Sequence, residues 1–579
     1  MIEDIIRNGL LVPLEKFGLF EGDIEIELGK PRERSHGDLS TNLAMVLAKQ
    51  VGRKPRELAG ELAAGLDLSK DIVESVEIAG PGFINFRLAR PYQVQLLLDI
   101  WQEEGALQEI KIGAGKRINV EYISANPTGP LNVVSARAGA FGATLVRLLR
   151  AIGFDAHSEY YVNDAGRQIV LLGQSLRAHY LRLRGEAAEM PEGGYMGRYL
   201  EIMAGELLEQ DSKAIQAATS AFNDESFQRI AAPEGNAEDW RQLPEEDSIR
   251  SFAKYALMKI LSWQRDTCRR YGLRFDTWYF ESELHETKRI ERALEQLRKR
   301  GAVYEEDDAV WFRATAYGDE KDRVLMRADD LPTYFLADVA YHYHKYQRGF
   351  EHAIDFWGPD HHGYIARVKG AMQALGAPVD WLEIQILQQV NFLEGGRVVD
   401  MSKRKGQFVT MDALIDEVGA DVAKYIFLTR KPESHLDFDL DVARQESTEN
   451  PVYYIKYAHA RICSVLHEAA LKGVDPGEPA PDSLALLAEE SELNLVRELI
   501  RLPQLIYSAA QTREPHRLTS FVYEVARLFH QFYHHCLILG SDPKTTRARL
   551  HLCLVTRRVL AYVLELMGIE APERMGEKD

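Results

Sequence analysis

The sequence predicts an α/β protein of three domains: a Rossmann-like domain that carries an insertion, a smaller α+β domain before it and an all-helical bundle after it. Its 579 residues exceed what one hydrophobic core normally spans. Strand, turn and helix patterns alternate from residue 117 onward, whereas the last part of the chain is amphipathic and helical throughout. We therefore expect domains at 1–105, 112–435 and 436–579, with a helical insertion at about 175–320.

The first domain mixes two kinds of pattern. Apolar residues recur at helical spacing in 43–49 and 58–63, and residues 76–86 have strand character around a Gly-Pro-Gly turn. This mixture predicts a compact α+β module.

The second domain begins with an apolar run, 117–122, that has the character of a buried strand. It breaks at the turn 126–130, and we expect a helix from about 131 to 150. A strand, a tight turn and a helix N-terminus gather free backbone N–H groups and the positive end of a helix dipole, which suits phosphate. An ordinary βα turn has the same pattern, so this segment alone leaves both interpretations open.

A second α/β portion follows the polar, helical stretch at 175–265. Its expected elements are a strand from 323, a helix over 333–346 and a strand over 353–358. The last strand ends in the polar loop 359–364, and parallel strands that end in polar loops place functional groups at one edge of a sheet.

Composition and charge narrow the class of protein. The four cysteines lack the paired spacing of a zinc site or a disulfide framework, so we expect reduced thiols and no zinc. No apolar run is long enough to cross a bilayer and the N-terminus lacks the pattern of a secretory signal, which favours a cytoplasmic enzyme without a membrane partner. The net charge of −18 argues against indiscriminate nucleic-acid binding, although a local basic face can coexist with it.

Motifs along nearly the whole chain resemble the arginyl-tRNA synthetases, class I aminoacyl-tRNA synthetases of bacterial type. Residues 36–42 and 79–85 are similar to that family's additional N-terminal domain, which contacts the tRNA elbow. The other matching segments are 120–131, 159–166, 322–327, 331–338 and 357–363 in the catalytic core, and 431–441, 450–461 and 571–575 in or beside the helical anticodon-binding domain. The resemblance implies a ligase that activates L-arginine with ATP and transfers it to the 3′ end of tRNA(Arg).

The resemblance also implies an arginine site, formed by Glu121, Asn126, Tyr334, Asp338 and His362. Asp338 would bind the guanidinium, and Tyr334 would lie one helical turn earlier on the same face. Glu121 and Asn126 would bind the α-amino end, with a backbone or water contact from His362. The alternative for Asp338 is a carboxylate on a helix surface.

ATP, with Mg²⁺ as part of the substrate, would lie against the turn after Asn126. The implied reaction is in-line attack of the arginine carboxylate on the α-phosphorus, for which Lys403, Arg404 and Asn132 are the expected catalytic residues. A lysine-rich turn is otherwise often only solvated surface. The implied ATP contacts are Asn126, Pro127, Thr128, Gly129, Asn132, Ser135, Gly358, His361, Met401, Ser402 and Lys403; no tightly bound cofactor is expected.

One motif departs from the family. After Pro130-Leu131 the usual His, apolar residue, Gly, His is replaced by Asn132, Val133, Val134 and Ser135. Either the site is reorganised and active, with Lys403, Arg404 and Arg137 supplying charge, or the chain is a synthetase-like protein that binds tRNA or arginine with a degraded ATP site. A class I synthetase for another amino acid is a third hypothesis, against which Asp338 and Tyr334 argue.

For tRNA, the resemblance and the mixture of aromatic and cationic side chains indicate Asn85, Tyr453, Tyr457 and Arg461. Aromatic residues at 529–534 have helical spacing, and we expect about half of them to be core. The partners are therefore tRNA(Arg), L-arginine and ATP, and the family favours a monomer.

Overall fold

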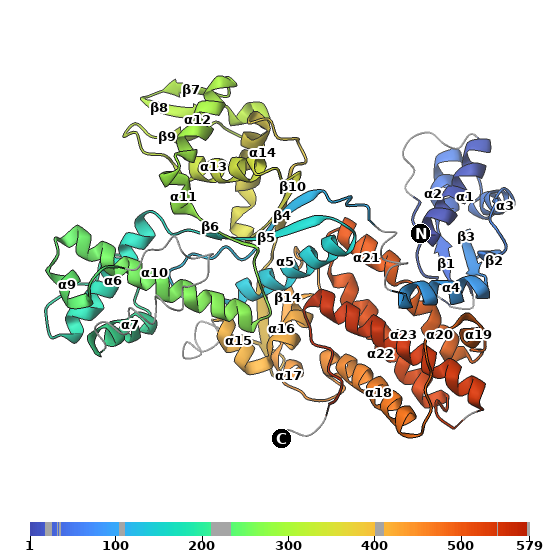
Figure 1. Ribbon diagram of the computed structural model, residues 1–579. Coiled ribbons are helices and arrows are strands. Elements are labelled where there is room, and N and C mark those ends of the chain that lie inside the picture. The colour runs from blue at the N-terminus through green and yellow to red at the C-terminus, as the bar shows by residue number, and fades with distance from the viewer. Residues whose placement is uncertain are drawn as a thin grey trace. The chain divides into compact units, whose positions relative to one another are not determined.

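The computed structural model describes residues 1–17, 26–31, 33, 36–102, 111–209, 233–399, 410–540 and 542–575. The chain forms two compact units (Figure 1). The first combines Met1–Ile112 with Ser447–Leu566 and Glu570–Asp579, and the second combines Gly113–Glu446 with Met567–Ile569. The first unit therefore contains segments from both ends of the sequence. Within the described ranges, no helix has the length and apolar character needed to span a membrane.

The N-terminal part of the first unit is the α+β module that the sequence predicts. A three-stranded antiparallel sheet, in the order β1-β3-β2, packs against helices through Leu58, Leu62, Ile84 and Phe86, all fully buried. The elements are α1 (Ile2–Lys16), β1 (Leu39–Thr41), α2 (Leu43–Val51), α3 (Pro55–Ala64), β2 (Val73–Ala79), β3 (Phe83–Leu88) and α4 (Arg90–Trp101).

The C-terminal part of the first unit is a helical bundle, as expected. Its core contains apolar side chains such as Ile455, Val522, Phe529 and Leu560. Residues 472–480 connect α18 to α19. The helices are α18 (Pro451–Leu471), α19 (Pro481–Leu484), α20 (Glu490–Leu499), α21 (Leu502–Gln511), α22 (His516–His535) and α23 (Pro543–Met567).

The second unit is built on a five-stranded parallel sheet in the order β11-β10-β4-β5-β6. The predicted strand and helix are confirmed, because β4 (Arg117–Glu121) leads through a turn to α5 (Val133–Ala151). A Cβ on Gly142 would lie 2.1 Å from the ring of Tyr122, so glycine permits the close packing of α5 on β4. The other strands are β5 (Asp155–Val162), β6 (Thr277–Phe280), β10 (His352–Trp357) and β11 (Leu382–Ile386).

Helices from the predicted insertion pack on one another around Trp240, Phe252 and Tyr255. The range 175–320 is not helical throughout, because β6 joins the parallel sheet and β7 and β8 form an antiparallel sheet with β9. These strands are only four residues long, too short for a clear period. The elements are α6 (Arg167–Leu183), α7 (Arg198–Glu209), α9 (Ala237–Gln242), α10 (Glu245–Arg270), α11 (Glu281–Glu286), α12 (Arg289–Lys299), β7 (Val303–Glu306), β8 (Ala309–Phe312), η4 (Ala314–Tyr317) and β9 (Arg323–Met326).

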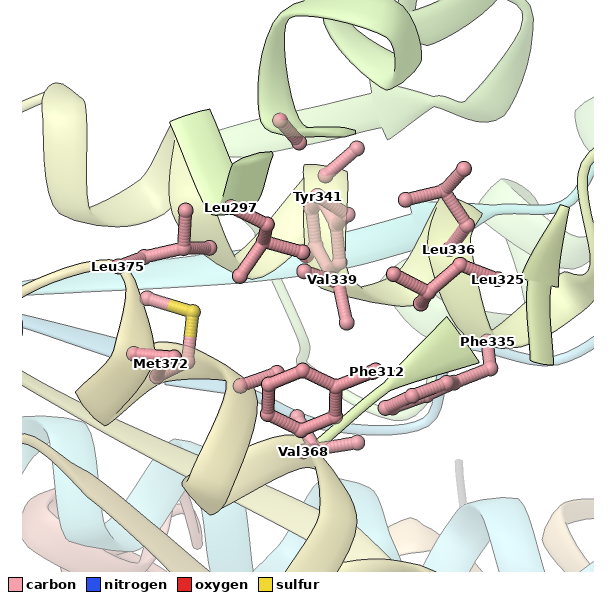
Figure 2. Close-up of a cluster of buried hydrophobic side chains, with 14 of the residues drawn as sticks. Leu297, Phe312, Leu325, Phe335, Leu336, Val339, Tyr341, Val368, Met372 and Leu375 are labelled. Atoms are coloured by element: carbon pink, nitrogen blue, oxygen red, sulfur yellow. The ribbon is translucent and has the colours of Figure 1, made fainter. Parts of the chain in front are cut away.

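Helix α13 (Tyr334–Gln347) lies in a hydrophobic core that fixes its orientation (Figure 2). Phe335, Leu336 and Val339 pack with Leu297 of α12 and Phe312 of β8. One face of α13 is thus held in the core, and its polar residues lie at the parallel sheet. After it come β10, η5 (Pro359–Tyr364) and α14 (Ile365–Ala374).

A second small sheet completes this unit. Strand β12 pairs with β13 and, in parallel, with β14, so residues 436–439 are a strand rather than the start of the helical bundle. The elements are β12 (Val390–Glu394), β13 (Arg397–Val399), α15 (Met411–Val418), α16 (Ala420–Phe427), β14 (Leu436–Asp439) and α17 (Leu440–Ala443).

Candidate active site

The backbone is strained where β4 ends. Ile123 and Ser124 have φ angles of 73° and 43°, in a region that side chains other than glycine rarely adopt, least of all a β-branched one. The Ser124 hydroxyl donates to Oε1 of Glu121 at 2.8 Å and accepts from the backbone N–H of Tyr161 at 3.1 Å. The strain therefore holds Glu121 at the carboxyl edge of the sheet, a feature that the sequence did not indicate.

The turn after Asn126 is held from outside by a buried glutamine of α10. Gln264 Nε2 donates to the carbonyl oxygens of Asn126 at 3.1 Å and Gly129 at 2.8 Å, and its Oε1 accepts from the Tyr160 hydroxyl at 3.0 Å. Tyr199 donates to the carbonyl of Thr128. Pro127 is buried, whereas Asn126 is exposed. The turn is thus fixed through its carbonyls, which leaves the Asn126 side chain available to a ligand.

Asn132 is the N-cap of α5. Its Oδ1 accepts from the backbone N–H of Ser135 at 2.9 Å and from the Ser135 hydroxyl at 3.2 Å. Asn132 is exposed, whereas Ser135 is 6% exposed. The Asn132 amide N–H₂ and the first backbone N–H groups of the helix are the donors that remain for an anion. The unusual motif therefore forms an intact helix start.

Arg137 does not reach this helix start, so its predicted role in charge stabilisation is wrong. It is fully buried and donates to the carbonyl oxygens of Gln388 at 2.6 Å, Lys431 at 3.0 Å and Ser434 at 2.8 Å. Burial lowers the pKa of its guanidinium to about 10. Arg137 instead ties α5 to the chain segments that precede β12 and β14.

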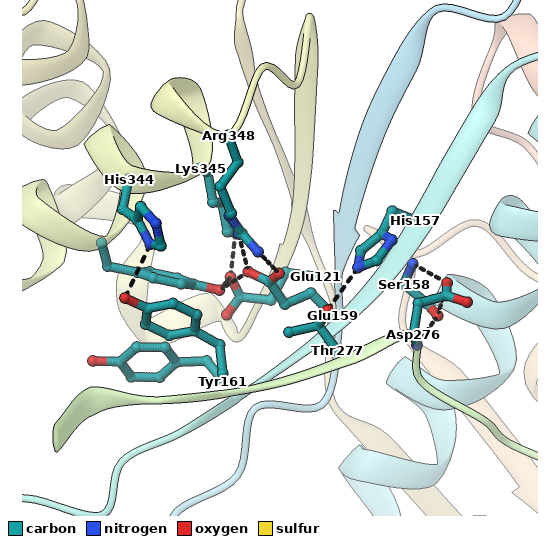
Figure 3. A network of polar contacts seen from close by, with 12 residues as sticks. Glu121, His157, Ser158, Glu159, Tyr161, Asp276, Thr277, His344, Lys345 and Arg348 are labelled. Atoms are coloured by element: carbon teal, nitrogen blue, oxygen red, sulfur yellow. Dashed lines mark hydrogen bonds and ion pairs between the residues drawn. The ribbon is translucent and has the colours of Figure 1, made fainter. Parts of the chain in front are cut away.

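A buried network of charges links the ends of β4 and β10 to α13 (Figure 3). Lys345 is fully buried and contacts Glu121. It also donates to Oδ1 of Asp355 in β10 at 2.9 Å. The Tyr341 hydroxyl lies 2.7 Å from both Glu121 and Glu159. Burial alone would lower the pKa of Lys345, but the attraction of Asp355 and Glu121 outweighs it and raises that pKa. Lys345 therefore stays a cation between Glu121 and Asp355.

Asp338 lies half-buried on α13, beside this network. Its Oδ2 accepts from the Tyr364 hydroxyl at 2.7 Å. Burial raises the pKa of Asp338 to about 6, the bond from Tyr364 opposes the rise, and the negative charges of Glu281 and Glu121 add to it. Glu281 and Glu121 are thus close enough to Asp338 to raise its pKa, an arrangement that suits a cationic ligand.

Glu281, which the sequence analysis missed, is the first residue of α11 and is 6% exposed. It accepts from the Tyr161 hydroxyl at 2.9 Å. The only available signal for Glu281 in the sequence was its position directly after the short strand β6.

Tyr334 begins α13 one turn before Asp338 and is 68% exposed.

Of the remaining predicted site residues, some lie in the part of the chain that the structure describes and others lie outside it. Gly358 precedes η5, in which His361 and His362 are exposed. Trp357 lies 6.1 Å from His361, ring centroid to ring centroid, and Tyr364 connects η5 to Asp338. Met401, Ser402, Lys403 and Arg404 lie outside the described residues. Among the residues that the structure describes, no group of three His, Cys, Asp or Glu side chains could hold a metal ion.

In the first unit, an aromatic and cationic face runs along α18 and α22. The rings of Tyr453 and Tyr457 are stacked with centroids 6.5 Å apart, and the Arg461 guanidinium lies over the rings of Tyr457 and Tyr533 at 4.6 and 4.7 Å. All four are half-buried. Stacked, partly exposed aromatic rings suit the bases of single-stranded nucleic acid.

Some of the other residues predicted to contact tRNA in the first unit are buried. Asn85 lies in β3 and is 2% exposed, which does not favour direct contact with a partner. Phe529 and Phe532 are fully buried, whereas Tyr533 and His534 are not. The expectation that half of this aromatic group is core is confirmed.

Three protein-family models match successive parts of the chain. They are the arginyl tRNA synthetase N terminal domain at residues 4–88, the catalytic domain of class I (R) tRNA synthetases at residues 97–439 and the DALR anticodon binding domain at residues 455–575.

Curated proteins and solved structures agree with these matches. The arginine–tRNA ligase of Moorella thermoacetica is 42% identical over 547 residues, 94% of this chain and 93% of that protein. That of Syntrophotalea carbinolica is 42% identical over 575 residues, 99% of each chain. The structure of Thermus thermophilus arginyl-tRNA synthetase, 21% identical, has a similar fold, with a TM-score of 0.72 over 99% of this chain and 100% of that one.

Proposed function

Because this chain belongs to the arginyl-tRNA synthetase family, we propose that the carboxylates around α13 bind arginine, while the turn at Asn126 and the N-terminus of α5 bind ATP. The protein is an arginine–tRNA ligase: it activates arginine with ATP and transfers the arginyl group to tRNA. The observation that carries the assignment of the amino-acid site is the placement of Asp338 beside Glu281 and Glu121, carboxylates that attract a cationic substrate such as arginine.

Within this site, Asp338 binds the guanidinium group. Tyr364 fixes the orientation of its carboxylate, and Glu281 supplies a second acceptor for the fork of guanidinium N–H groups. Tyr334 closes the outer side. Glu121, held by Ser124, Tyr341 and Lys345, binds the α-amino group together with Asn126. His362 contributes a backbone or water contact.

ATP binds as its Mg²⁺ complex, which is a substrate rather than a resident cofactor. Its phosphates lie at the N-terminus of α5, where the Asn132 amide donates to a phosphate oxygen while its carbonyl caps the helix. The surrounding contacts are Pro127, Thr128, Gly129, Ser135, Gly358 and His361. Lys403 and Arg404, with Met401 and Ser402, stabilise the pyrophosphate that leaves as the arginine carboxylate attacks the α-phosphorus.

The tRNA lies along both parts of the first unit. The face of Tyr453, Tyr457 and Arg461 stacks with anticodon bases, which the half-buried, stacked rings support. Asn85 acts through the packing of β3. The three family matches, at 4–88, 97–439 and 455–575, support the proposed division into N-terminal, catalytic and anticodon-binding domains, with the last boundary after β14 rather than at 436. We also propose that the protein acts as a monomer in the cytoplasm.

Charging of tRNA(Arg) by the purified chain, with arginine, ATP and Mg²⁺, tests these assignments. We expect charging by the unmodified protein and a loss of about 10²–10³-fold in kcat for Lys403→Ala, the effect of removing one donor to developing charge. Lys299→Ala, which removes an exposed lysine paired with Glu295, is the matched control and should charge normally. Equal activity of the two variants would refute the role of Lys403, and no charging by any form would mean that the altered ATP motif is degraded.

A further inference from the structure

A cavity of about 440 Å³ lies on the opposite face of the parallel sheet from the carboxylates. Successive residues of a strand face opposite sides, so Glu121 contacts Tyr341 of α13 while Tyr122 packs against Gly142 of α5. Tyr122 lines this cavity. Along α5, Asn132 and the cavity-lining Arg147 are 15 residues apart, or about 22 Å at the rise of an α-helix. The cavity is therefore separate from the active site.

Four arginines line this cavity. Arg147 and Arg150 come from the last two turns of α5, Arg269 from the end of α10, and Arg274 from the segment that leads into β6. Helix-terminal arginines often only complement a helix dipole. That explanation does not cover Arg274, which lies beyond the helix end.

Among the described side chains, carboxylates pair with Arg150 and Arg269 but not with Arg274. Asp276 pairs with Arg150 at 2.8 Å and is also held by the Ser158 hydroxyl at 2.6 Å. The Asp266 carboxylate lies 3.5 Å from the Arg269 guanidinium. Both side chains are exposed, Arg269 to 76% and Asp266 to 48%. In the part of the chain that the structure describes, Arg274 has no ion pair within 4.0 Å. Arg274 thus adds a positive charge to the cavity wall in a protein whose net charge is −18.

We propose that this cavity binds phosphate groups. The planar fork of a guanidinium matches two phosphate oxygens, and arginines from three segments surround one space large enough for more than one phosphate. The phosphates come either from the tRNA backbone, which would give the catalytic unit a tRNA contact distant from the 3′ end, or from a small free polyphosphate. The tRNA source depends on the proposed function, whereas the small anion does not.

Charge-reversal variants of the full-length protein distinguish these sources. Arg269→Glu and Arg274→Glu change exposed side chains, so both should fold with unchanged thermal midpoints. Arg250→Glu makes the same charge change on an exposed part of α10, beside Glu246 and Asp247, and is the matched control. Arg274→Lys keeps the positive charge but loses the planar fork of N–H donors. Its affinity for phosphate should therefore lie between those of the unmodified protein and Arg274→Glu.

The first measurement is calorimetric titration with tripolyphosphate in the presence of saturating ATP. A small-anion site predicts one binding event that Arg250→Glu keeps and Arg274→Glu loses. The second measurement is the KM for tRNA between 50 and 200 mM salt. A backbone contact predicts that Arg274→Glu raises this KM about 3- to 10-fold at low salt. The slope of log KM against log salt concentration should fall by about 1, the contribution of one phosphate contact, while the KM values for ATP and arginine stay unchanged. Either result supports the site and identifies its source. If Arg269→Glu and Arg274→Glu both behave like Arg250→Glu in the two measurements, the proposal is refuted.

Discussion

At the scale of single residues, we expect the protonation of Asp338 to control arginine binding. Burial raises the pKa of this carboxyl to about 6 in the protein without arginine. A guanidinium binds the ionised form, so protons compete with arginine as the pH falls through 6. We expect kcat/KM for arginine to fall about tenfold per pH unit below 6, at saturating ATP and tRNA, while the KM for ATP changes little.

The fall in kcat/KM below pH 6 is the acidic limb of the pH profile. Tyr364→Phe tests whether that limb belongs to Asp338. The Tyr364 hydroxyl donates to Asp338 at 2.7 Å and lowers its pKa, so its removal should move the limb to higher pH. Tyr346→Phe, which removes a hydroxyl on the same helix that donates to the carbonyl of Gly376, is the control and should leave the limb in place. A limb that stays at the same pH in Tyr364→Phe would assign it to another group.

Asn132 is the N-cap of α5, and we propose that it also binds phosphate; substitutions can separate these two functions. As N-cap it accepts from the Ser135 N–H, and as a phosphate donor it uses its amide N–H₂. Asn132→Asp and Asn132→Ser both keep a cap, so the thermal midpoint should change little. Because both lose the amide donor, and aspartate also adds negative charge, we expect the KM for ATP to rise in charging assays, by about tenfold or more for Asn132→Asp. An unchanged KM for ATP in both variants would limit Asn132 to capping.

At the scale of elements, α10 holds the turn that we propose binds ATP, through Gln264. Gln264→Leu keeps a similar volume but leaves the carbonyls of Asn126 and Gly129 without their donor. Two lost hydrogen bonds of about 1 kcal/mol each predict a rise in the KM for ATP of up to about 30-fold, measured at saturating arginine and tRNA. Ile260→Val removes one methylene from the same helix where it packs on other helices, and provides a control for destabilisation alone. Equal KM values for the two variants would contradict the positioning role.

The elements also show which features a sequence can predict. Strand β4, helix α5 and helix α13 follow from strong local periodicity, and Asp338 follows from a motif on α13. Gln264 and Glu281 lie more than 130 residues from the turn and from Glu121, so only the packing of α10 and β6 on the sheet reveals them. Arg137 shows the opposite error. Its place beside the ATP motif suggested a phosphate contact, whereas the helix turns its side chain into a set of buried carbonyls.

At the scale of the whole molecule, the first unit depends on contacts between segments more than 400 residues apart. Glu498 of α20 is 2% exposed and accepts from Lys30 Nζ at 2.8 Å, while Arg497 Nε lies 3.0 Å from Asp38 Oδ1. These ion pairs join the N-terminal module to the helical bundle. We expect Glu498→Gln to remove about 1–2 kcal/mol of stabilisation, and to lower the thermal midpoint of this unit by several degrees.

Amide hydrogen exchange distinguishes a loss of this junction from a loss of helix stability. In Glu498→Gln, exchange in β1, β2 and β3 should accelerate, because the module then opens separately from the bundle. Glu490→Gln makes the same change at an exposed position of α20 and should leave exchange in these strands unaltered. If Glu498→Gln accelerates exchange only within α20, the two parts of the unit are joined by apolar packing, and the ion pairs contribute little to their association.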